Sequence, residues 1–158
     1  VVRPVLAELK RAGEQRYKQL AESMPQIVLT LGADGTSLYH NQRWFDYTGL
    51  STVASMSGAW DFVLHADDAP DFHERWKHAV ESGENFDGMY RLRKGSDGSH
   101  RWHLVRAVPV RDDRGLVASW IMTCTDVDDR KRGEESLQLL AEARSHGAVK
   151  KTPDIASS

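Results

Sequence analysis

Three segments in the second half of the chain alternate between apolar and polar residues, as strands with one buried face do. They cover residues 86–93, 100–110 and 116–125, and the turns between them contain Asp97-Gly98 and the stretch 112–115. Tight turns of this kind join antiparallel strands, whereas a parallel pair needs a crossover of about a dozen residues or more. The pattern therefore predicts a three-stranded antiparallel meander.

Two more strands are predicted before the meander. Residues 26–31 are mostly apolar, and residues 36–40 follow them after the Gly- and Asp-containing turn at 32–35. A short turn between two such runs is typical of a β-hairpin. The chain is therefore expected to start its sheet with a hairpin.

Helices are predicted between the hairpin and the meander. Asn41 is placed to cap a short helix, and the stretch that follows to about Trp60 is rich in serine and glycine and is predicted as loop. Asp67 or Asp68 is placed to cap a longer helix, which Gly83 stops. Short polar side chains favour the first position of a helix, and glycine favours the position after its end.

Apolar residues at helical spacing continue on both sides of this region. The predicted organisation is an N-terminal amphipathic linker helix at 1–24, a central domain at 25–127, a C-terminal helix at 128–145 and a disordered tail at 146–158. The apolar stripes contain Leu6, Leu9, Leu20 and Met24 at one end and Leu137, Leu140 and Ala141 at the other. Such stripes favour pairing with a second chain, while the alternative is that the first helix folds back on its own sheet.

Composition narrows the class of protein. The chain has 158 residues, a net charge of −2, 40% hydrophobic and 28% charged residues, which fits one globular domain without the basic field of a nucleic-acid-binding protein. No apolar run is long enough for a membrane span, so no membrane contact is expected. A single cysteine, Cys124, is typical of a reducing compartment, and cytoplasm is the expected location. The start at Val1 suggests a segment of a longer protein.

Several short motifs together resemble the PAS fold, in the PAS_3 type with its C-terminal PAC part, which is common in bacterial sensor histidine kinases. The resemblance covers about Tyr17 to Leu137. The motifs that carry it are Asn41-Gln42-Arg43-Trp44-Phe45-Asp46-Tyr47-Thr48-Gly49, His65-Ala66-Asp67-Asp68, Tyr90-Arg91-Leu92 before Asp97-Gly98, Arg101-Trp102, and Thr125-Asp126-Val127-Asp128-Asp129-Arg130-Lys131. It implies an α+β fold, in which helices cover one face of a five-stranded antiparallel sheet and leave a pocket between the layers.

The resemblance also implies a path for the signal. In the family the junction after the last strand couples the sheet to the outgoing helix, and Asp126 is expected to anchor it through an ion pair or backbone hydrogen bonds. Asp128 stands where the family has a hydroxyl side chain, which alters the hydrogen bonding of the junction. The alternative is that both carboxylates only stabilise the start of the helix, where the helix dipole favours negative charge.

A ligand pocket is predicted around Gly88, because an apolar side chain normally fills this position of a core-facing strand. The alternative is a β-bulge, or a large neighbour such as Trp44 or Trp102 that fills the gap. The pocket candidates are Trp44, Phe45, Phe72, Trp76, Gly88, Tyr90, Trp102, Leu104, Arg106, Trp120 and Met122.

Cofactor chemistry has few candidates. His73 is the only histidine of the long helix near its apolar face, and it is the candidate axial ligand for haem, although a surface histidine is the commoner case. The flavin photochemistry of related light sensors needs a cysteine after the helix asparagine, but Gln42 follows Asn41. His100 and His103 lie on opposite faces of one strand, so no metal site is predicted. The expected state is one without a cofactor.

The chain is predicted not to be an enzyme. It has no glycine-rich ATP lid, no phosphoacceptor histidine in a dimerisation helix and no nucleophile elbow of a serine hydrolase. The function expected from the resemblance is a sensory module of a two-component system, which binds a small ligand or partner, forms homodimers through its flanking helices and signals to a histidine kinase domain outside this chain. A constitutive docking domain without ligand is the first alternative, and a haem or flavin sensor is the second.

Overall fold

The computed structural model describes the backbone of residues 2–157 and the side chains of residues 11–16 and 18–145. Its elements, in chain order, are α1 Val2–Ser23, β1 Ile27–Gly32, β2 Ser37–His40, α2 Gln42–Thr48, α3 Thr52–Met56, α4 Ala59–Val63, α5 Ala69–Ser82, β3 Phe86–Arg93, β4 His100–Arg111, β5 Val117–Asp126 and α6 Asp128–Ser157. Residues 1–126 form one compact unit, and residues 127–158 form a second.

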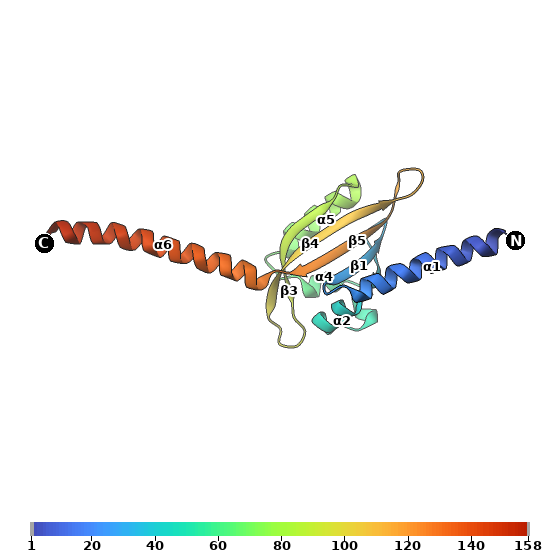
Figure 1. Ribbon diagram of the computed structural model, residues 1–158, viewed down its shortest axis with the longest axis horizontal. Coiled ribbons are helices and arrows are strands. Elements are labelled where there is room, and N and C mark those ends of the chain that lie inside the picture. The colour runs from blue at the N-terminus through green and yellow to red at the C-terminus, as the bar shows by residue number, and fades with distance from the viewer. Residues whose placement is uncertain (1, 158) are drawn as a thin grey trace. The chain divides into compact units, whose positions relative to one another are not determined.

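The five strands form one antiparallel sheet in the order β2-β1-β5-β4-β3 (Figure 1). β1 pairs with β5 from Ile27 opposite Cys124 to Gly32 opposite Ser119, which brings the two ends of the domain together in the middle of the sheet. β3, β4 and β5 form the meander that the alternating pattern predicts. The prediction of a five-stranded antiparallel PAS-type sheet is confirmed.

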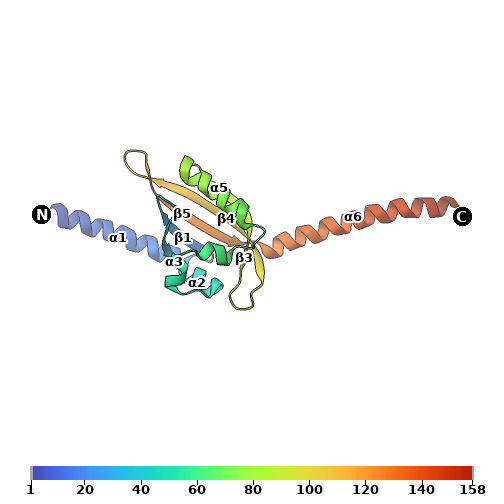
Figure 2. The same ribbon diagram turned by 180° about the vertical axis from the view of Figure 1, so that it is seen from behind.

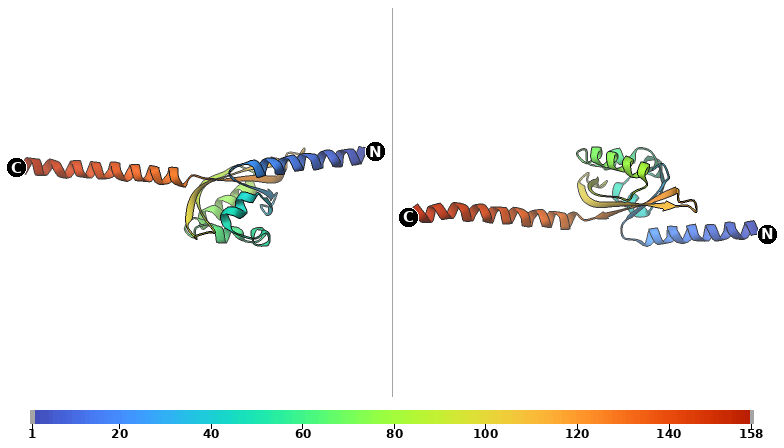
Figure 3. Two further views of the ribbon diagram at one scale, coloured as in Figure 1. Left: turned by 60° about the horizontal axis from the view of Figure 1, so that its bottom comes forward. Right: turned by 90° about the horizontal axis from the view of Figure 1, so that it is seen from above.

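Helices α2, α3 and α5 cover one face of the sheet (Figure 2), and α1 lies on the opposite side (Figure 3). The core between the sheet and its covering helices is largely aromatic: Trp44, Phe72 and Trp120 are all less than 2% exposed. Tight packing of such large side chains fixes the helices on the sheet, because each buries about 150–250 Å².

Two short helices, α3 and α4, occupy the stretch that the sequence predicts as loop, so that prediction is wrong for these residues. Ser51 caps α3 by accepting a hydrogen bond from the Ala54 amide at 3.1 Å. Gly58 precedes α4 with a φ of 68°, a left-handed conformation that glycine adopts without strain. Helices of five residues are too short to leave a periodic pattern, which is why the sequence does not reveal them.

Asn41 and Asp68 stand at the first positions of α2 and α5, as predicted, but neither side chain caps its helix. The Asp68 carboxylate instead accepts hydrogen bonds from the Arg91 backbone amide at 2.7 Å and from its guanidinium at 2.7 and 3.1 Å. Burial alone would raise the pKa of Asp68, but the bonds and charge of Arg91 hold it below its ordinary value. Asp68 therefore fastens the start of α5 to β3.

Asn41 joins three segments of the domain. Its side-chain amide donates to the carbonyls of Ala21 at 3.0 Å and Gln26 at 2.9 Å, and its side-chain oxygen accepts from the Val28 amide at 3.0 Å. The Asn41 backbone amide also donates to the Val28 carbonyl at 2.9 Å. Because Asn41 is fully buried, these bonds hold the end of α1 against β1 without competition from water.

The second unit is the helix α6. Its backbone continues to Ser157, past the end expected near residue 145, and the side chains of the predicted disordered tail at 146–158 lie outside the described residues. The side chains of Leu137 and Leu140 are exposed, as is that of Leu20 in α1, whereas those of Leu6 and Leu9 are not among the described ones. Within the described part of the chain, no helix is long and apolar enough to cross a bilayer.

Candidate functional site

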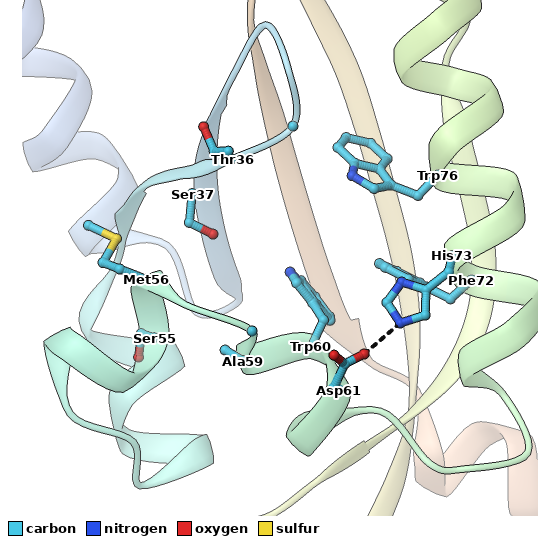
Figure 4. Close-up of a pocket in the computed structure, with 12 residues that line it drawn as sticks. Thr36, Ser37, Ser55, Met56, Ala59, Trp60, Asp61, Phe72, His73 and Trp76 are labelled. Atoms are coloured by element: carbon cyan, nitrogen blue, oxygen red, sulfur yellow. Dashed lines mark hydrogen bonds and ion pairs between the residues drawn. The ribbon is translucent and has the colours of Figure 1, made fainter.

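A cavity of about 280 Å³ opens between the β1–β2 hairpin, the α3–α4 segment and α5 (Figure 4). Three aromatic rings, Trp60, Phe72 and Trp76, form one side of it. The polar lining comes from the hydroxyls of Thr36, Ser37 and Ser55 and from Asp61 and His73, and the lining is completed by Gly35, Met56, Gly58 and Ala59. The cavity thus offers ring faces together with Asp61 and His73 on the side of α4 and α5, and hydroxyl groups on the side of the hairpin and α3.

The aromatic wall continues into the core as a chain of touching rings. Trp60 stacks on Phe72 with a centroid distance of 4.9 Å and an interplanar angle of 26°. Trp44 contacts Trp60 at 5.4 Å, and Trp76 contacts Trp120 of β5 at 5.2 Å. Ring contacts of this kind are directional, so the cavity wall has a defined shape that is linked to the central strand β5.

A hydrogen bond between two exposed side chains lies at the edge of the cavity. His73 Nε2 of α5 and Asp61 Oδ1 of α4 are 2.9 Å apart, as Figure 4 shows, and both side chains are substantially exposed. An exposed pair of this type contributes only about 0–1 kcal/mol to stability. Its position between two lining helices makes it a contact that a ligand group can replace.

Two buried nitrogen atoms near the aromatic wall have no hydrogen-bond partner within the described residues. They are Nε2 of His40 and Nε1 of Trp120. The His40 ring lies 4.9 Å from the Trp44 ring, and the Trp120 ring lies 5.2 Å from the Trp76 ring. Both residues therefore contact the series of aromatic rings that extends from the cavity wall into the core. An unsatisfied buried polar group destabilises a protein by about 1–3 kcal/mol.

The burial of His40 leads to a testable pH dependence. Burial lowers the pKa of His40 from 6.5 to about 4, so the unfolded chain binds a proton in this range that the folded chain does not. Stability is therefore expected to fall as the pH falls from about 6.5 to 4. His40→Phe removes this contribution, and urea unfolding at several pH values should show a flatter dependence. The exposed residue His78 gives the control: if His78→Phe flattens the curve equally, His40 is not the source.

Seven of the predicted pocket residues share the face of the sheet that the helices cover. Trp44, Phe72, Tyr90, Trp120 and Met122 are buried there, and Phe45 and Trp76 are half-buried against the same core. Of the predicted ligand-pocket candidates, only Phe72 and Trp76 line the cavity, together with the predicted haem ligand His73. The other five of these seven residues lie in the core behind the cavity.

Trp102, Leu104 and Arg106 are not brought together with the other pocket candidates. On β4 the buried residues are His103, Val105 and Ala107, which puts the alternate positions on the opposite face of the sheet. Because Trp102 and Leu104 are large and apolar, the sequence suggests that their side of the strand faces the core, and the structure shows the opposite. Trp102 stacks there under the guanidinium of Arg91, 4.9 Å from its ring centre.

Gly88 leaves no space for a ligand, so the pocket predicted at this position is wrong. A Cβ atom at Gly88 would lie 2.5 Å from the Tyr90 ring and 2.7 Å from the Arg75 guanidinium. Arg75 donates to the Tyr90 hydroxyl at 3.0 Å, and that hydroxyl donates to Asp71 at 2.8 Å. Burial and the bond to Asp71 raise the pKa of Tyr90 to about 12. The large neighbours expected as an alternative are therefore Tyr90 and Arg75, and not tryptophans.

Trp60, Ser55 and the hairpin residues Thr36 and Ser37 were not recognised as site residues from the sequence. They lie on the β1–β2 hairpin and on α3 and α4 or next to them, elements whose contact depends on the tertiary fold. The only sign of this site in the sequence is the cluster of small residues around Trp60, and such a cluster is typical of a loop.

The strand end at Asp126 carries an ion pair. Arg101 donates from Nε to Asp126 Oδ2 at 2.7 Å and from Nη2 to Oδ1 at 3.4 Å. In the helical unit, Asp128 is buried and pairs with Arg132 one turn later at 2.5 Å. The geometry agrees with the ion pair that the resemblance implies for Asp126, and with a stabilising role of Asp128 at the start of α6.

The histidines considered as candidate ligands make other contacts in the structure. Among the described residues no group of three or more metal-binding side chains comes together. His103 is buried, whereas the ring of His100 contacts that of His65 edge-on at 4.8 Å, so the two strand histidines have different surroundings. His73 Nε2 lies 2.9 Å from Asp61 Oδ1, and a haem iron would have to displace this contact in order to bind the same nitrogen.

Comparison with known proteins places the chain in a family. The sequence matches PAS_4, described as a PAS fold, over residues 21–132, and this is the subtype found in place of the expected PAS_3. It is 37% identical over 80% of its length to the peroxide stress-activated histidine kinase mak1 of Schizosaccharomyces pombe. It is 28% identical over 90% of its length to the uncharacterized protein y4lL of Sinorhizobium fredii. The chain spans only 8% and 17% of these two relatives.

Solved structures agree on the fold. An RNA-binding light-oxygen-voltage receptor matches 82% of the chain with a TM-score of 0.70 at 20% identity, and the chain covers 37% of that structure. A sensory box histidine kinase/response regulator from Burkholderia thailandensis matches 83% of the chain with a TM-score of 0.61 at 20% identity, and the chain covers 98% of that structure. With its sheet, its covering helices and this match over most of its length, the chain belongs to the PAS family of sensory domains.

Proposed function

We propose that this chain senses a small aromatic molecule in the cavity between the β1–β2 hairpin and α5, and that it does so as one module of a longer signalling protein. The observation that carries the proposal is the cavity itself, with three aromatic rings on one side and hydroxyl groups on the other. Its volume of about 280 Å³ lies just below the range of about 300–1,000 Å³ that is usual for ligand sites. A single-ring ligand matches this size.

The polar groups define the rest of the ligand. Trp120 Nε1 is a donor in need of an acceptor, and neutral His40 has one nitrogen without a partner. Both atoms lie behind the rings and not in the cavity lining, so a ligand reaches them only if a ring such as Trp60 or Trp76 moves. A flat ring with one hydroxyl or carbonyl group can supply the hydrogen-bond partner that these two nitrogen atoms lack. At the edge of the cavity, the ligand replaces the contact between His73 and Asp61.

A route from the cavity to the end of β5 supports the relay. Trp76 lines the cavity and contacts Trp120, which belongs to β5, and β5 ends at Asp126, bound to Arg101. Occupancy that shifts Trp76 therefore acts on the strand that leads to α6. The proposed output is the kinase domain of a parent histidine kinase, as the relatives suggest, with homodimers formed through the flanking helices in the cytoplasm.

Peroxide, named in the description of the relative from Schizosaccharomyces pombe, is not proposed as a direct signal for Cys124. The Cys124 thiol is 1% exposed, and burial raises its pKa well above the ordinary value. Oxidation by peroxide needs an accessible thiolate. Any response of a parent protein to peroxide would have to use other groups.

A second candidate function is constitutive docking without a ligand. The observation that favours it is the filled interior: Trp44 and Trp120 are completely buried, and the remaining cavity lies at the edge of the core. In that case the cavity is only an imperfection of packing, and the domain acts through its surface and helices.

Native mass spectrometry of the chain purified from cells separates the two candidates. The sensor proposal expects a fraction of the protein to carry an added mass that is lost on denaturation. Ser37→Phe, which fills the cavity from β2, should remove this mass, whereas Leu38→Phe on the outer face of the same strand should retain it. A bare chain in all three samples supports docking.

A further inference from the structure

A second concave site lies at the end of the sheet where β1 begins and β5 ends. It has a volume of about 320 Å³ and is formed by α2, the β3–β4 turn, the start of β1 and the last residues of β5. It shares no lining residue with the aromatic cavity. It is therefore a separate site, and nothing in the sequence pattern points to it.

Two cations at this site have no counter-ion in the described part of the chain. Arg43 of α2 and Lys94 of the β3–β4 turn line the site, and neither has an ion pair or a side-chain hydrogen bond to any described residue. Lys94 acts on Asp97 only through its electric field. Two positive charges on separate elements thus face one concavity without a direct ion pair among the described side chains.

The acidic side chains of the same site are already engaged. Asp126 accepts two hydrogen bonds from Arg101, at 2.7 and 3.4 Å, and Asp46 accepts one from the Gln42 side chain at 3.0 Å. The Arg101 ion pair neutralises the charge of Asp126. Asp46 keeps its negative charge, because the Gln42 amide is neutral, so Arg43 and Lys94 together leave a balance of one positive charge for a ligand.

The floor of the site is apolar and well packed. Ile27 and Cys124 are 5% and 1% exposed and come from neighbouring strands. The Tyr47 ring packs edge-on against His103 at 5.0 Å, and its hydroxyl donates to the Leu92 carbonyl at 2.7 Å. A ring or short hydrocarbon body can lie on this floor while its charged end meets the two cations.

We propose that this site binds a small organic carboxylate with an aromatic or short apolar body. The apolar body contacts Ile27, Tyr47 and Cys124, and the carboxylate lies between Arg43 and Lys94. Because Asp126 lines the same site, the ligand also changes the surroundings of the residue at which β5 ends. The site gives the domain a second input, independent of the aromatic cavity.

Benzoate is the test probe, with benzamide as its uncharged counterpart, and two-dimensional ¹H–¹⁵N spectra of the whole chain report binding. Benzoate is expected to shift the amide signals of Tyr47, Lys94 and Cys124, and to leave the indole signals of Trp60 and Trp76 in place. Benzamide is expected to bind at least about tenfold more weakly, which corresponds to about 1.4 kcal/mol.

The double variant Arg43→Gln/Lys94→Gln should weaken benzoate binding by about tenfold or more. The matched control is Lys77→Gln/Arg114→Gln, which removes two exposed cations elsewhere and should bind as the unaltered chain does. Equal affinity for benzoate and benzamide, or equal loss in both double variants, overturns the proposal. Because the readout separates this site from the tryptophans of the other cavity, either proposal can fail without the other.

Discussion

Gly95→Ala is expected to destabilise the domain more than the same change at any other glycine whose surroundings the structure describes. A Cβ atom at Gly95 would lie 2.2 Å from the Thr48 carbonyl oxygen, 2.6 Å from its carbon and 2.9 Å from the Gly49 nitrogen. All three are backbone atoms at the end of α2, which cannot turn aside as a side chain does. The Gly95 amide also donates to the Tyr47 carbonyl at 2.8 Å, so the turn and the helix are tied together at this point.

Overpacking of this kind costs about 3 kcal/mol, which corresponds to a fall in Tm of roughly 10 °C for a domain of this size. Thermal unfolding followed by circular dichroism measures it. Gly13→Ala in α1 is the matched control, because its added Cβ atom meets no described atom within 4 Å outside the backbone of its own helix and its chain neighbours. It is expected to raise helix stability by about 0.5–1 kcal/mol. A Tm for Gly95→Ala within about 2 °C of the unaltered protein would contradict the packing of α2 against the β3–β4 turn.

Asn41→Ala is the second substitution with a large expected effect. It leaves the carbonyls of Ala21 and Gln26 and the amide of Val28 without their side-chain partner in a fully buried position. Each unsatisfied group costs about 1–3 kcal/mol, and a total loss of about 4 kcal/mol is expected from the sum. Hydrogen exchange should also show faster exchange at the end of α1 and the start of β1.

Gln42→Ala tests whether the effect belongs to Asn41 alone. Gln42 is the next residue, its side chain is exposed, and its one described side-chain bond goes to Asp46 on the surface. Its replacement is expected to change stability by less than about 0.5 kcal/mol. Equal losses for the two variants would show that the helix start, and not the buried amide, holds α1 to the sheet.

The sheet was predictable from the sequence because its signals are local. The antiparallel meander follows from local patterns alone, without knowledge of distant contacts. These patterns are the alternation of apolar and polar residues over 86–93 and 100–110 and the turn at Asp97-Gly98. The short turn at 32–35 in the same way predicts the hairpin of β1 and β2. The resemblance to the PAS fold implied five antiparallel strands, but the pairing of β1 with β5 was not predicted, because no local pattern reveals it.

The site was less predictable, because its residues meet only in the folded chain. Gly88 lies where Arg75 and Tyr90 approach the strand closely, and not at a cavity. In the sequence, a glycine at a close approach cannot be told from a glycine beside a cavity. On β4, Trp102 and Leu104 are more apolar than His103 and Ala107, but the buried face is the latter one. Asn41 and Asp68 stand where caps belong, yet their bonds reach Ala21 and Arg91, which the sequence cannot indicate.

The central claim is that the aromatic cavity takes up a small ring compound and passes its presence to β5. The five tryptophans provide the most direct test, because each gives a separate indole N–H signal. Phenol added to the ¹⁵N-labelled chain is expected to shift the signals of Trp60, Trp76 and Trp120 and to leave that of Trp102, on the outer face, unchanged. Ser37→Phe should abolish these shifts and Leu38→Phe should preserve them. Unchanged indole signals at millimolar phenol, or equal shifts in Ser37→Phe, would contradict the claim.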